Sequence, residues 1–510
     1  MVGGHVLGGG AGIFALPSSG GSGFYPAGHW VPAQQSMIQV YPRPDTETST
    51  NARHRWAYYD GTNPIQYSIP IGVSFGAYPF VYTLQSGPAG MSIGQIYGSS
   101  NYGIITWTPT GSVSGATVQV LVTDQQLNTL TITWTVSTSS STSHFIFVNS
   151  SAGSDSNAGT FALPFQTLSK AFGATFAATA NAGAIVYLRN GTYTPPGYTD
   201  NDINVSHALF EMNTTTKPIA LIGYPGETAT LTMTGCMGAV GNNGADLFWQ
   251  NLNPNGGNAS EGNMRVVWMT GITGINRMTF DSISWTNATT GSDGSDNASM
   301  FHSGNGAGSL RQYLFLHACS ESGRTSGTPG NNYAGCDLYA WQYALVQGFV
   351  TTPAGSVDGN IYFKGDEADS EMRECFTQQT NGGTACSVGF EQNLDPQRCL
   401  VRHNRCIMNA GGLYLGHDPP VNAFGVLWAV RNSVIGVYNA LYANSGGGPY
   451  VFDSNFAQFS NTSICFPTGS FVQTDGLNQA IASGGLDSST CLLIGASRTN
   501  YLGTVGAEIA

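Results

Sequence analysis

Charged residues with the potential for catalysis are concentrated in the segment KGDEADSEMRE, at residues 364–374. Glycoside hydrolases need two or three carboxylates close together on one face, one acting as the acid and another as the base or nucleophile. Asp366, Asp369 and Glu371 are the candidates for such a set. The segment therefore predicts a candidate hydrolytic site.

A polysaccharide lyase is the second chemistry that this segment permits. A lyase uses a base to remove the proton beside a uronate carboxylate, while calcium or other cations neutralise that carboxylate. Asp366 and Glu367 are the candidate metal ligands, with Arg402 or Lys364 near the base. We predict no cofactor, and calcium is the one candidate that a lyase would add.

A structural explanation competes with both chemistries. A second charged segment, RCLVRHNR at residues 398–405, follows the first by about one repeat of the chain. Glu371 precedes Arg398 by 27 residues, and Glu374 precedes Arg402 by 28. Residues with this spacing would stack on neighbouring coils of a repetitive fold and form ion pairs. We expect such a ladder of ion pairs in preference to a catalytic site.

Other residues with chemical potential also have structural explanations. His417 and Asp418 precede two prolines, a pattern typical of a turn, and His317 and His403 are expected to be structural. Aromatic side chains expected in loops could stack on sugars, although buried packing is equally expected for each. These aromatic candidates are Trp249, Trp268, Trp341, Tyr339 and Tyr343.

Short strand-like blocks recur along the second half of the chain, at residues 278–283, 315–319, 372–376, 401–407, 430–435 and 452–456. Arg373, Arg402 and Arg431 are evenly spaced, 29 residues apart. A repeat of this length indicates a solenoid. Roughly 12 coils at about 4.8 Å each would make a body on the order of 60 Å long. Asn, Cys and Ser at like positions would stack inside it, and residues 232–365 are expected to carry long loops on one face.

One amphipathic unit precedes these repeats. Residues 145–148 (FIFV) and 184–188 (AIVYL) predict two buried strands, with turns at residues 153–164 between them. Thr167 stands at the N-cap of a short helix, and Leu168, Ala171, Phe172 and Thr175 form one apolar stripe at helical spacing. Two more strands are predicted within residues 217–231.

Three stretches of this region resemble the opening of right-handed parallel β-helix proteins of the pectate-lyase-like superfamily. They are FVNSSAGSDSNAGTFALPFQTLSKAF (147–172), VYLRNGTYT (186–194) and KPIALIGYPGETATL (217–231). The resemblance implies an all-β solenoid over residues 145–510, whose helix near 167–180 covers the open end of the first coil. The same opening occurs in lyases, hydrolases, phage tailspikes and inert virion proteins, so it leaves the activity open.

Two further zones are predicted before the solenoid. Residues 1–61 are rich in Gly and Pro and end in a basic patch, which favours an arm that docks on a partner or on sister subunits. Residues 62–137 alternate with period two and resemble an Ig-like, cadherin-like β-sandwich, in YPFVYTLQSGPAGMSIG, GIITWTPTG and VQVLVTDQQLNTLTITWTV. Asp124 is expected to be a turn residue there. Residues 138–144 are a Ser/Thr linker.

Composition restricts the function. Only 9% of the 510 residues are charged, against roughly 25% in an ordinary soluble domain, and 68 are Gly. The net charge of -12 disfavours nucleic acid and anionic membranes, and no run of about 18 apolar residues predicts a membrane span. The nine cysteines show no zinc spacing and are expected to be buried thiols. The N-terminal MVGGHVLGGGAGIF lacks the features of a secretory signal.

An export-like composition without an export signal favours release by lysis as part of a phage particle. We therefore predict a structural protein of a virion surface, such as a capsid decoration, fibre or spike. It would contact other virion proteins through the arm, form a homo-oligomer such as a trimer, and adsorb host polysaccharide. The alternative is a polysaccharide-degrading enzyme, either a tailspike depolymerase, a lyase or a glycoside hydrolase.

Overall fold

The structure is a computed structural model of the chain. It describes residues 36–47, 50–172, 183–194, 220–232, 238–240, 245–256, 265–269, 276–286, 299–303, 311–322, 334–352, 360–364, 368–378, 388–391, 398–407, 413–415, 427–430, 432–437, 441–443, 450–453, 456–459, 472–475 and 479–482.

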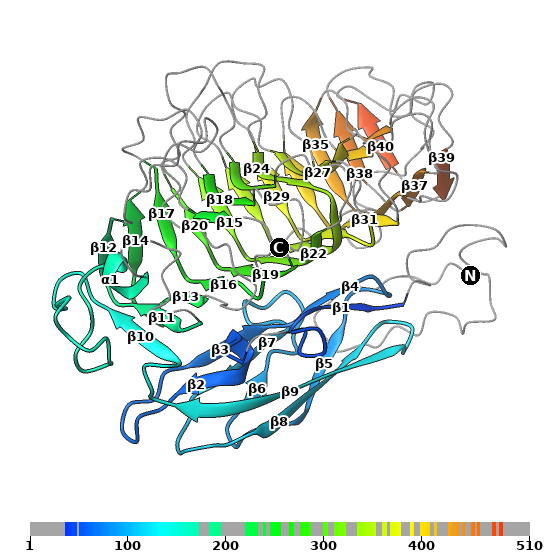
Figure 1. Ribbon diagram of the computed structural model, residues 1–510. Coiled ribbons are helices and arrows are strands. Elements are labelled where there is room, and N and C mark those ends of the chain that lie inside the picture. Colours follow the sequence, from blue (N-terminus) through cyan, green and yellow to red (C-terminus); the bar gives the residue numbers. More distant parts are fainter. Residues whose placement is uncertain are drawn as a thin grey trace.

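Three long parallel sheets make up the larger part of the molecule (Figure 1). Sheet A consists, in spatial order, of β10 (Phe145–Val148), β11 (Ile185–Leu188), β13 (Ala220–Gly223), β16 (Phe248–Gln250), β19 (Asn276–Asp281), β22 (Arg311–His317), β25 (Trp341–Gln347), β28 (Glu371–Arg373), β31 (Cys399–Arg402), β34 (Leu427–Val430), β37 (Tyr450–Asp453) and β39 (Val472–Asp475). Sheet B consists of β15 (Gly238–Val240), β18 (Arg265–Met269), β21 (Ser299–Ser303), β24 (Ala334–Tyr339), β27 (Asn360–Lys364), β30 (Val388–Glu391), β33 (Leu413–Leu415) and β36 (Leu441–Ala443).

Sheet C consists of β20 (Ser284–Trp285), β23 (Ser320–Ser322), β26 (Val350–Thr352), β29 (Phe376–Gln378), β32 (Arg405–Ile407), β35 (Ser433–Val437), β38 (Phe456–Phe459) and β40 (Gln479–Ala482). A short parallel sheet of β12 (Gly191–Tyr193), β14 (Ala229–Thr232) and β17 (Asn253–Asn255) precedes it. From β18 to β38 the chain visits sheets B, A and C in turn, and each strand pairs with its equivalent one coil later. This connectivity is that of a parallel β-helix and confirms the predicted solenoid; the described part of sheet A has 12 strands.

The coil length varies along the solenoid. Arg373 pairs with Arg402, so the 29-residue spacing seen in the sequence corresponds to one coil. Arg402 pairs in turn with Val430 rather than with the next residue, Arg431, which lies outside the described residues. The repeat is therefore real but is not exact from coil to coil. The long loops predicted within 232–365 fall largely outside the described residues.

Sheet A is buried on both faces. Its first strands, FIFV and IVYL, are continuous apolar runs in which every residue is buried, as expected of a parallel strand covered on both sides. Ile146 and Val186 belong to the core inside the β-helix. Phe145, Phe147 and Tyr187 alternate with them and join the core of the N-terminal part of the chain. Sheet A is therefore the wall between two hydrophobic cores.

Sharp turns join sheet A to sheet C and carry a ladder inside the solenoid. The first residue of the turn has a left-handed backbone, with φ of 57° at Glu374 and 56° at His403. The next residue points inward: the Cys375 amide donates to Asn404 Oδ1 at 2.8 Å, and Asn404 Nδ2 donates to Asn432 Oδ1 at 3.0 Å. Stacked Asn and Cys residues were expected from the sequence, and these contacts confirm them.

A short helix, α1 (Leu168–Phe172), lies at the first coil. Thr167 caps it as predicted, because Lys170 N donates to Thr167 Oγ1 at 3.1 Å. Leu168 and Ala171 are buried with the first strands of the solenoid core. The rest of the predicted helix, beyond residue 172, lies outside the described residues. No helix of the described residues is long and apolar enough to cross a membrane.

Residues 36–47 and 50–139, which we call the N-terminal unit, form three small sheets. Their elements are β1 (Ile38–Tyr41), η2 (Arg53–Arg55), β2 (Trp56–Tyr58), β3 (Tyr67–Pro70), β4 (Gly72–Ser74), β5 (Val81–Ser86), β6 (Ser92–Ile93), β7 (Ile104–Trp107), β8 (Ala116–Thr123) and β9 (Thr129–Ser139). The sheet orders are β1-β4, β3-β7-β6 and β2-β9-β8-β5. All pairings are antiparallel except β2 with β9.

The N-terminal unit lies along one side of the β-helix, where β1 and β4 pack on sheet A (Figure 1). Two of its strands, β1 and β2, come from residues that the sequence assigns to the arm, so the folded unit extends before residue 62. Residues 1–35 of the arm lie outside the described residues. Asp124 is a turn residue as predicted, accepting the amides of Gln126 and Asn128 at 2.8 and 2.9 Å. The Ig-like assignment stays a prediction.

Candidate functional site

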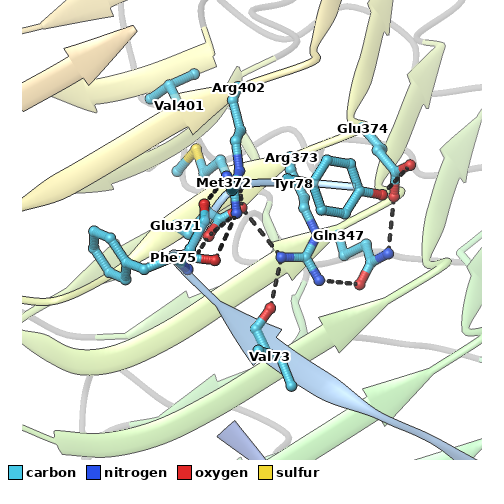
Figure 2. Close-up of polar contacts among 12 residues, drawn as sticks. Val73, Phe75, Tyr78, Gln347, Glu371, Met372, Arg373, Glu374, Val401 and Arg402 are labelled. Carbon is cyan, nitrogen blue, oxygen red and sulfur yellow. Dashed lines mark hydrogen bonds and ion pairs between the residues drawn. The ribbon is translucent and has the colours of Figure 1, made fainter. Parts of the chain in front are cut away.

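Two neighbouring strands of sheet A, β28 and β31, carry buried charges on their outer face. Met372 and Val401 belong to the core inside the β-helix. Period-two alternation therefore turns their neighbours toward the N-terminal unit. We call these neighbours, with the first residue of the following turn, the seam cluster (Figure 2): Glu371, Arg373, Glu374 and Arg402.

Glu371 is the centre of the seam cluster. Its carboxylate accepts from Arg402 Nε at 2.7 Å, from Arg402 Nη2 at 3.1 Å and from Arg373 Nη1 at 3.2 Å. Glu371 and Arg373 are 0% exposed and Arg402 is 4% exposed. Arg373 also donates from Nη1 to the carbonyl of Val73, at 2.6 Å. A buried carboxylate thus joins two guanidinium groups from adjacent coils.

The same cluster binds the turn at Phe75 and Gly76 in the N-terminal unit. The Phe75 amide donates to Glu371 Oε2 at 2.6 Å, while Arg402 donates to the carbonyls of Gly76 and Phe75 at 2.7 and 3.1 Å. Both turn residues have left-handed backbones, with φ of 59° and 70°. A Cβ at residue 76 would approach Met37 Cγ to 2.6 Å, so this position requires glycine. Two buried charged side chains, Glu371 and Arg402, therefore hold a strained turn.

Tyr78 extends the network. Its hydroxyl donates to Glu374 Oε1 at 2.6 Å, and Gln347 donates to Glu374 Oε2 at 2.8 Å. Arg373 completes the ring by donating to Gln347 Oε1 at 2.9 Å. The guanidinium carbons of Arg373 and Arg402 lie 4.8 and 5.0 Å from the centroid of the Tyr78 ring. These cation–π contacts add to the hydrogen bonds because the site is shielded from water.

The pKa directions reflect this burial. Burial, and secondarily Glu374, raise the pKa of Tyr78 well above its ordinary value. Burial lowers the pKa of Arg402, although Glu371 opposes the shift. For Arg373 burial acts in the same direction, but Glu371 and the nearby tyrosines outweigh it and raise the pKa. Both guanidinium groups stay charged at neutral pH, so the network depends on the Glu371 carboxylate.

The predicted catalytic residues divide into separate groups. Glu371 and Arg402 come together as a buried ion pair between coils, the kind of contact that the structural alternative predicts. A catalytic role for either residue stays a prediction. Asp369 pairs with Arg398 at 2.6 Å, at the edge of sheet A. The pairing differs from the predicted register, since Glu371 contacts Arg402 rather than Arg398. Asp366 lies outside the described residues.

No metal site is found in the part of the chain that the structure describes, judged by groups of three or more His, Cys, Asp or Glu side chains. Asp366 and Glu367, the candidate calcium ligands, lie outside that part, as does the side chain of Lys364. The calcium site stays a prediction.

The aromatic candidates lie on strands, which corrects the expectation that they are exposed in loops. Trp249 and Trp341 are 1% and 0% exposed, because they point into the solenoid core. Trp341 Nε1 donates there to Ser303 Oγ at 3.2 Å. Tyr343 is partly exposed and stacks on Tyr313, with ring centroids 4.9 Å apart. The side chain of Trp268, in β18, lies outside the described residues.

The predicted structural histidines do make structural contacts. His317 Nδ1 lies 2.7 Å from Asp281 Oδ1 on sheet A, and the His403 ring packs edge-on against Tyr78 at 5.3 Å. His417 and Asp418 lie outside the described residues.

A second polar group, which the sequence analysis missed, lies on sheet B. His302 Nδ1 is 3.2 Å from Asp337 Oδ2, and the His302 and Tyr339 rings are 6.1 Å apart. Cys336 and Leu338 belong to the solenoid core, so alternation places Asp337 and Tyr339 on the outer face of β24. We call His302, Asp337 and Tyr339 the sheet B group. The alternation in GCDLY at residues 335–339 could have revealed it.

Register places further residues in line with the sheet B group. Trp268 pairs with His302, and Asp337 pairs with Tyr362. Beyond them the same position is occupied by Gly389, Tyr414 and Tyr442. Successive coils are separated by about 4.8 Å. Aromatic residues therefore recur at one register position, parallel to the solenoid axis, on both sides of the His–Asp pair.

No protein-family model and no curated protein sequence matches this chain. Among solved structures, it is similar to the native GH136 lacto-N-biosidase from Eubacterium ramulus, with 11% identity, 67% of each chain covered and a TM-score of 0.32. It is also similar to the Family 28 exopolygalacturonase from Yersinia enterocolitica, with 11% identity, 75% of this chain and 74% of that chain covered, and a TM-score of 0.26. Neither similarity is high enough to carry an argument, and the β-helix rests on its own strand pairing.

Proposed function

We propose that the protein recognises a polysaccharide along the outer face of sheet B, on a solenoid that winds right-handed. The observation that carries this proposal is the sheet B group, in which an imidazole, a carboxylate and an aromatic ring meet on rigid strands. Aromatic faces stack on the C–H faces of sugar rings. The His302 side chain is 12% exposed and can bind a hydroxyl through Nε2, while Asp337, 2% exposed, orients the imidazole from below. The aromatic register positions on neighbouring coils extend this surface in the direction of an extended chain.

Cleavage of the bound polysaccharide is a second candidate function, favoured by the contact between His302 and Asp337. A carboxylate beside Nδ1 favours the neutral tautomer that is protonated there, which leaves the lone pair on Nε2. An imidazole oriented in this way is suited to act as a general base, as a lyase requires. A glycoside hydrolase would need a second carboxylate beside Asp337. This candidate function is the polysaccharide-degrading alternative of the sequence analysis. Its catalytic residues would lie on sheet B instead of within residues 366–402.

The test combines binding and cleavage measurements on the full chain. Binding is measured by affinity electrophoresis in gels that contain capsular polysaccharide, pectate or a neutral glucan. Tyr339→Ala is expected to weaken retention about tenfold, which is about 1.4 kcal/mol. Tyr343→Ala, which alters a partly exposed tyrosine on sheet A, serves as the matched control and is expected to leave retention unchanged. Equal retention of both variants, or no retention of the wild type, contradicts the proposal.

Cleavage is measured with the same polysaccharides by new reducing ends and by absorbance of an unsaturated uronate. If sheet B carries the reaction, His302→Gln abolishes product, whereas Arg398→Ala on the edge of sheet A does not. Product that persists in His302→Gln and disappears in Asp366→Ala would return the site to the predicted acidic segment. Binding without product supports recognition alone.

The virion-surface setting, the docking arm and the homo-oligomer stay proposals from composition. Imaging of purified virions with an antibody to residues 62–137 tests the setting, and light scattering of the full chain against a variant that lacks residues 1–35 tests assembly.

A further inference from the structure

A small pocket lined by both charged and apolar side chains lies where the N-terminal unit meets the β-helix. Tyr41, Glu47, Arg53 and His54 line one side, and Asp246 and Arg277 line the other. Its cavity volume is about 20 Å³, enough for about one water-sized group, such as a single oxygen atom of a ligand. We call it the seam pocket. It contains most of the basic patch at the end of the predicted arm, namely Arg43, Arg53 and His54. These residues take no part in the sheet B group.

Four polar atoms in the walls of the seam pocket are buried without a hydrogen-bond partner among the described residues: Tyr41 Oη, Arg53 Nε, His54 Nδ1 and His54 Nε2. Arg53 and His54 are each 2% exposed, and Tyr41 is 9% exposed. Buried donors without a partner are rare in folded proteins, because each has lost its water without compensation. Four such atoms around one small cavity indicate that a polar group binds there.

Tyr41 Oη and Arg53 Nε are both held rigidly. Unlike the His54 nitrogens, which donate or accept according to the tautomer, each of them carries a hydrogen to donate. Tyr41 stacks on Phe248, with ring centroids 5.7 Å apart, and therefore cannot turn toward solvent. Arg53 Nη1 donates to the carbonyl of Trp56 at 2.7 Å, and its guanidinium lies 4.9 Å from the centroid of the Tyr67 ring. These contacts fix Oη and Nε before any ligand arrives, which lowers the entropic cost of binding.

The charges around the seam pocket favour an anion. Glu47 Oε2 lies 3.1 Å from His54 Nε2 and 2.8 Å from Arg55 Nε, so its charge is compensated by other side chains. Asp246 is paired with Arg277, and Arg43, which also lines the pocket, is paired with Asp45 at 2.7 Å. Within the described residues Arg53 has no carboxylate partner, although it is almost fully buried. One positive charge is thus left for a ligand to balance.

We propose that the seam pocket binds a small oxyanion, such as a carboxylate group or inorganic phosphate. One ligand oxygen accepts from both Tyr41 Oη and Arg53 Nε, and the negative charge compensates the Arg53 guanidinium. Because the pocket has walls from both the N-terminal unit and the β-helix, bound anion strengthens the contact between them. The site is independent of the sheet B group and of any polysaccharide.

The test is thermal unfolding of the full chain in acetate and in phosphate, each compared with chloride at constant ionic strength. A binding site gives a rise in Tm that follows a binding isotherm, whereas a general salt effect increases steadily with concentration. Acetate and phosphate separately show whether the pocket prefers a planar carboxylate or a tetrahedral anion. We expect such a rise with at least one of them.

Tyr41→Phe removes one hydroxyl and keeps the ring. In chloride its Tm is expected to equal or exceed that of the wild type, because a buried donor without a partner is removed. Its dependence on acetate or phosphate is expected to shift to about tenfold higher concentration. Tyr67→Phe is the matched control: it loses hydrogen bonds to the His54 carbonyl at 2.7 Å and to Trp134 Nε1 at 3.1 Å. It is expected to lower Tm at every concentration and to keep the anion dependence.

Two results would overturn the proposal. One is a wild type that shows no binding isotherm with either anion. The other is an identical anion response in the wild type and in Tyr41→Phe, which would mean that the pocket holds water alone.

Discussion

The Glu371 carboxylate accepts the amide of Phe75 at 2.6 Å, although 296 residues separate them in the chain. The contact joins strand β28 of the solenoid to a left-handed turn of the N-terminal unit. Two guanidinium groups share the same carboxylate. The two parts of the molecule are therefore joined by a buried ionic site as well as by apolar packing.

Glu371→Gln is expected to destabilise this seam strongly. It leaves Arg373 and Arg402 buried without a carboxylate, and breaking a buried ion pair in this way costs about 3–5 kcal/mol. Urea unfolding followed by tryptophan fluorescence measures the loss, and hydrogen exchange at the Phe75 amide locates it. A loss below about 1 kcal/mol, or undiminished protection of that amide, contradicts this account.

Arg398→Ala tests a neighbouring ion pair that differs in exposure. Arg398 is 55% exposed and contacts Asp369 at 2.6 Å. Solvent screens the Arg398 side of the pair, but the Asp369 side chain is 4% exposed and, among the described residues, would keep only a hydrogen bond from Gln342. The substitution is therefore expected to cost about 1–2 kcal/mol, and less at high salt. The same urea experiment at low and high salt makes the comparison. A cost equal to that of Glu371→Gln would show that burial does not set the difference.

Asn404→Ala tests the ladder inside the solenoid. Asn404 accepts from the Cys375 amide at 2.8 Å and donates to the Met372 carbonyl at 3.2 Å. Alanine leaves the Cys375 amide buried without a partner and removes one bond to the Met372 carbonyl, which is expected to cost about 1–3 kcal/mol. Asn63→Ala, which removes an exposed contact to Asp60, is the control and is expected to change stability by about 0.5 kcal/mol or less. Urea midpoints of the two variants measure both losses of stability, and equal losses would contradict a stabilising role for the Asn404 ladder.

The repeating parts of this fold could be predicted from the sequence because they depend on local pattern. Buried strands at residues 145–148 and 184–188, the Thr167 cap and the one-coil spacing of Arg373 and Arg402 all follow from residues close together in the chain or in register. A solenoid stacks each coil on the previous one, so short-range periodicity is enough to specify it.

The seam and the sheet B group could not be predicted in the same way. Arg373 contacts the Val73 carbonyl across 300 residues, and no local pattern encodes a contact at that separation. His302 and Asp337 are 35 residues apart, whereas Cys375 and Asn404 are 29 apart, so a fixed repeat length does not align the first pair. The burial of Trp341, which is 0% exposed, could not be predicted either, because a tryptophan on a strand can face the core or the solvent.

The Glu227–Arg189 pair predicts a specific effect of pH. Arg189 donates hydrogen bonds to Glu227 at 2.6 and 3.0 Å, and these lower the pKa of Glu227 below its ordinary value of 4.5. Burial acts in the opposite direction, but its effect is smaller. A carboxyl group with a lowered pKa contributes stability that is fully present above the ordinary value and is lost as pH falls through the lowered one. The stability difference between wild type and Glu227→Gln should therefore be constant near neutrality and shrink below about pH 4.5. Urea midpoints from pH 3 to pH 7 measure it, and a difference that grows on acidification contradicts the assignment.

The thiols inside the solenoid are expected to be inert while the protein is folded. Burial raises the pKa of Cys375 and that of Cys406 to about 12 in each case, and both side chains are fully buried. Because the thiolate is the reactive form, iodoacetamide at pH 8 should leave both unmodified in the native protein and modify both in urea. Ser114→Cys, on an exposed loop, provides a positive control that reacts without denaturant. Peptide mass mapping reads out each site. Modification of Cys375 or Cys406 at the rate of the control would show that the coils open readily, and would contradict a continuously packed solenoid core.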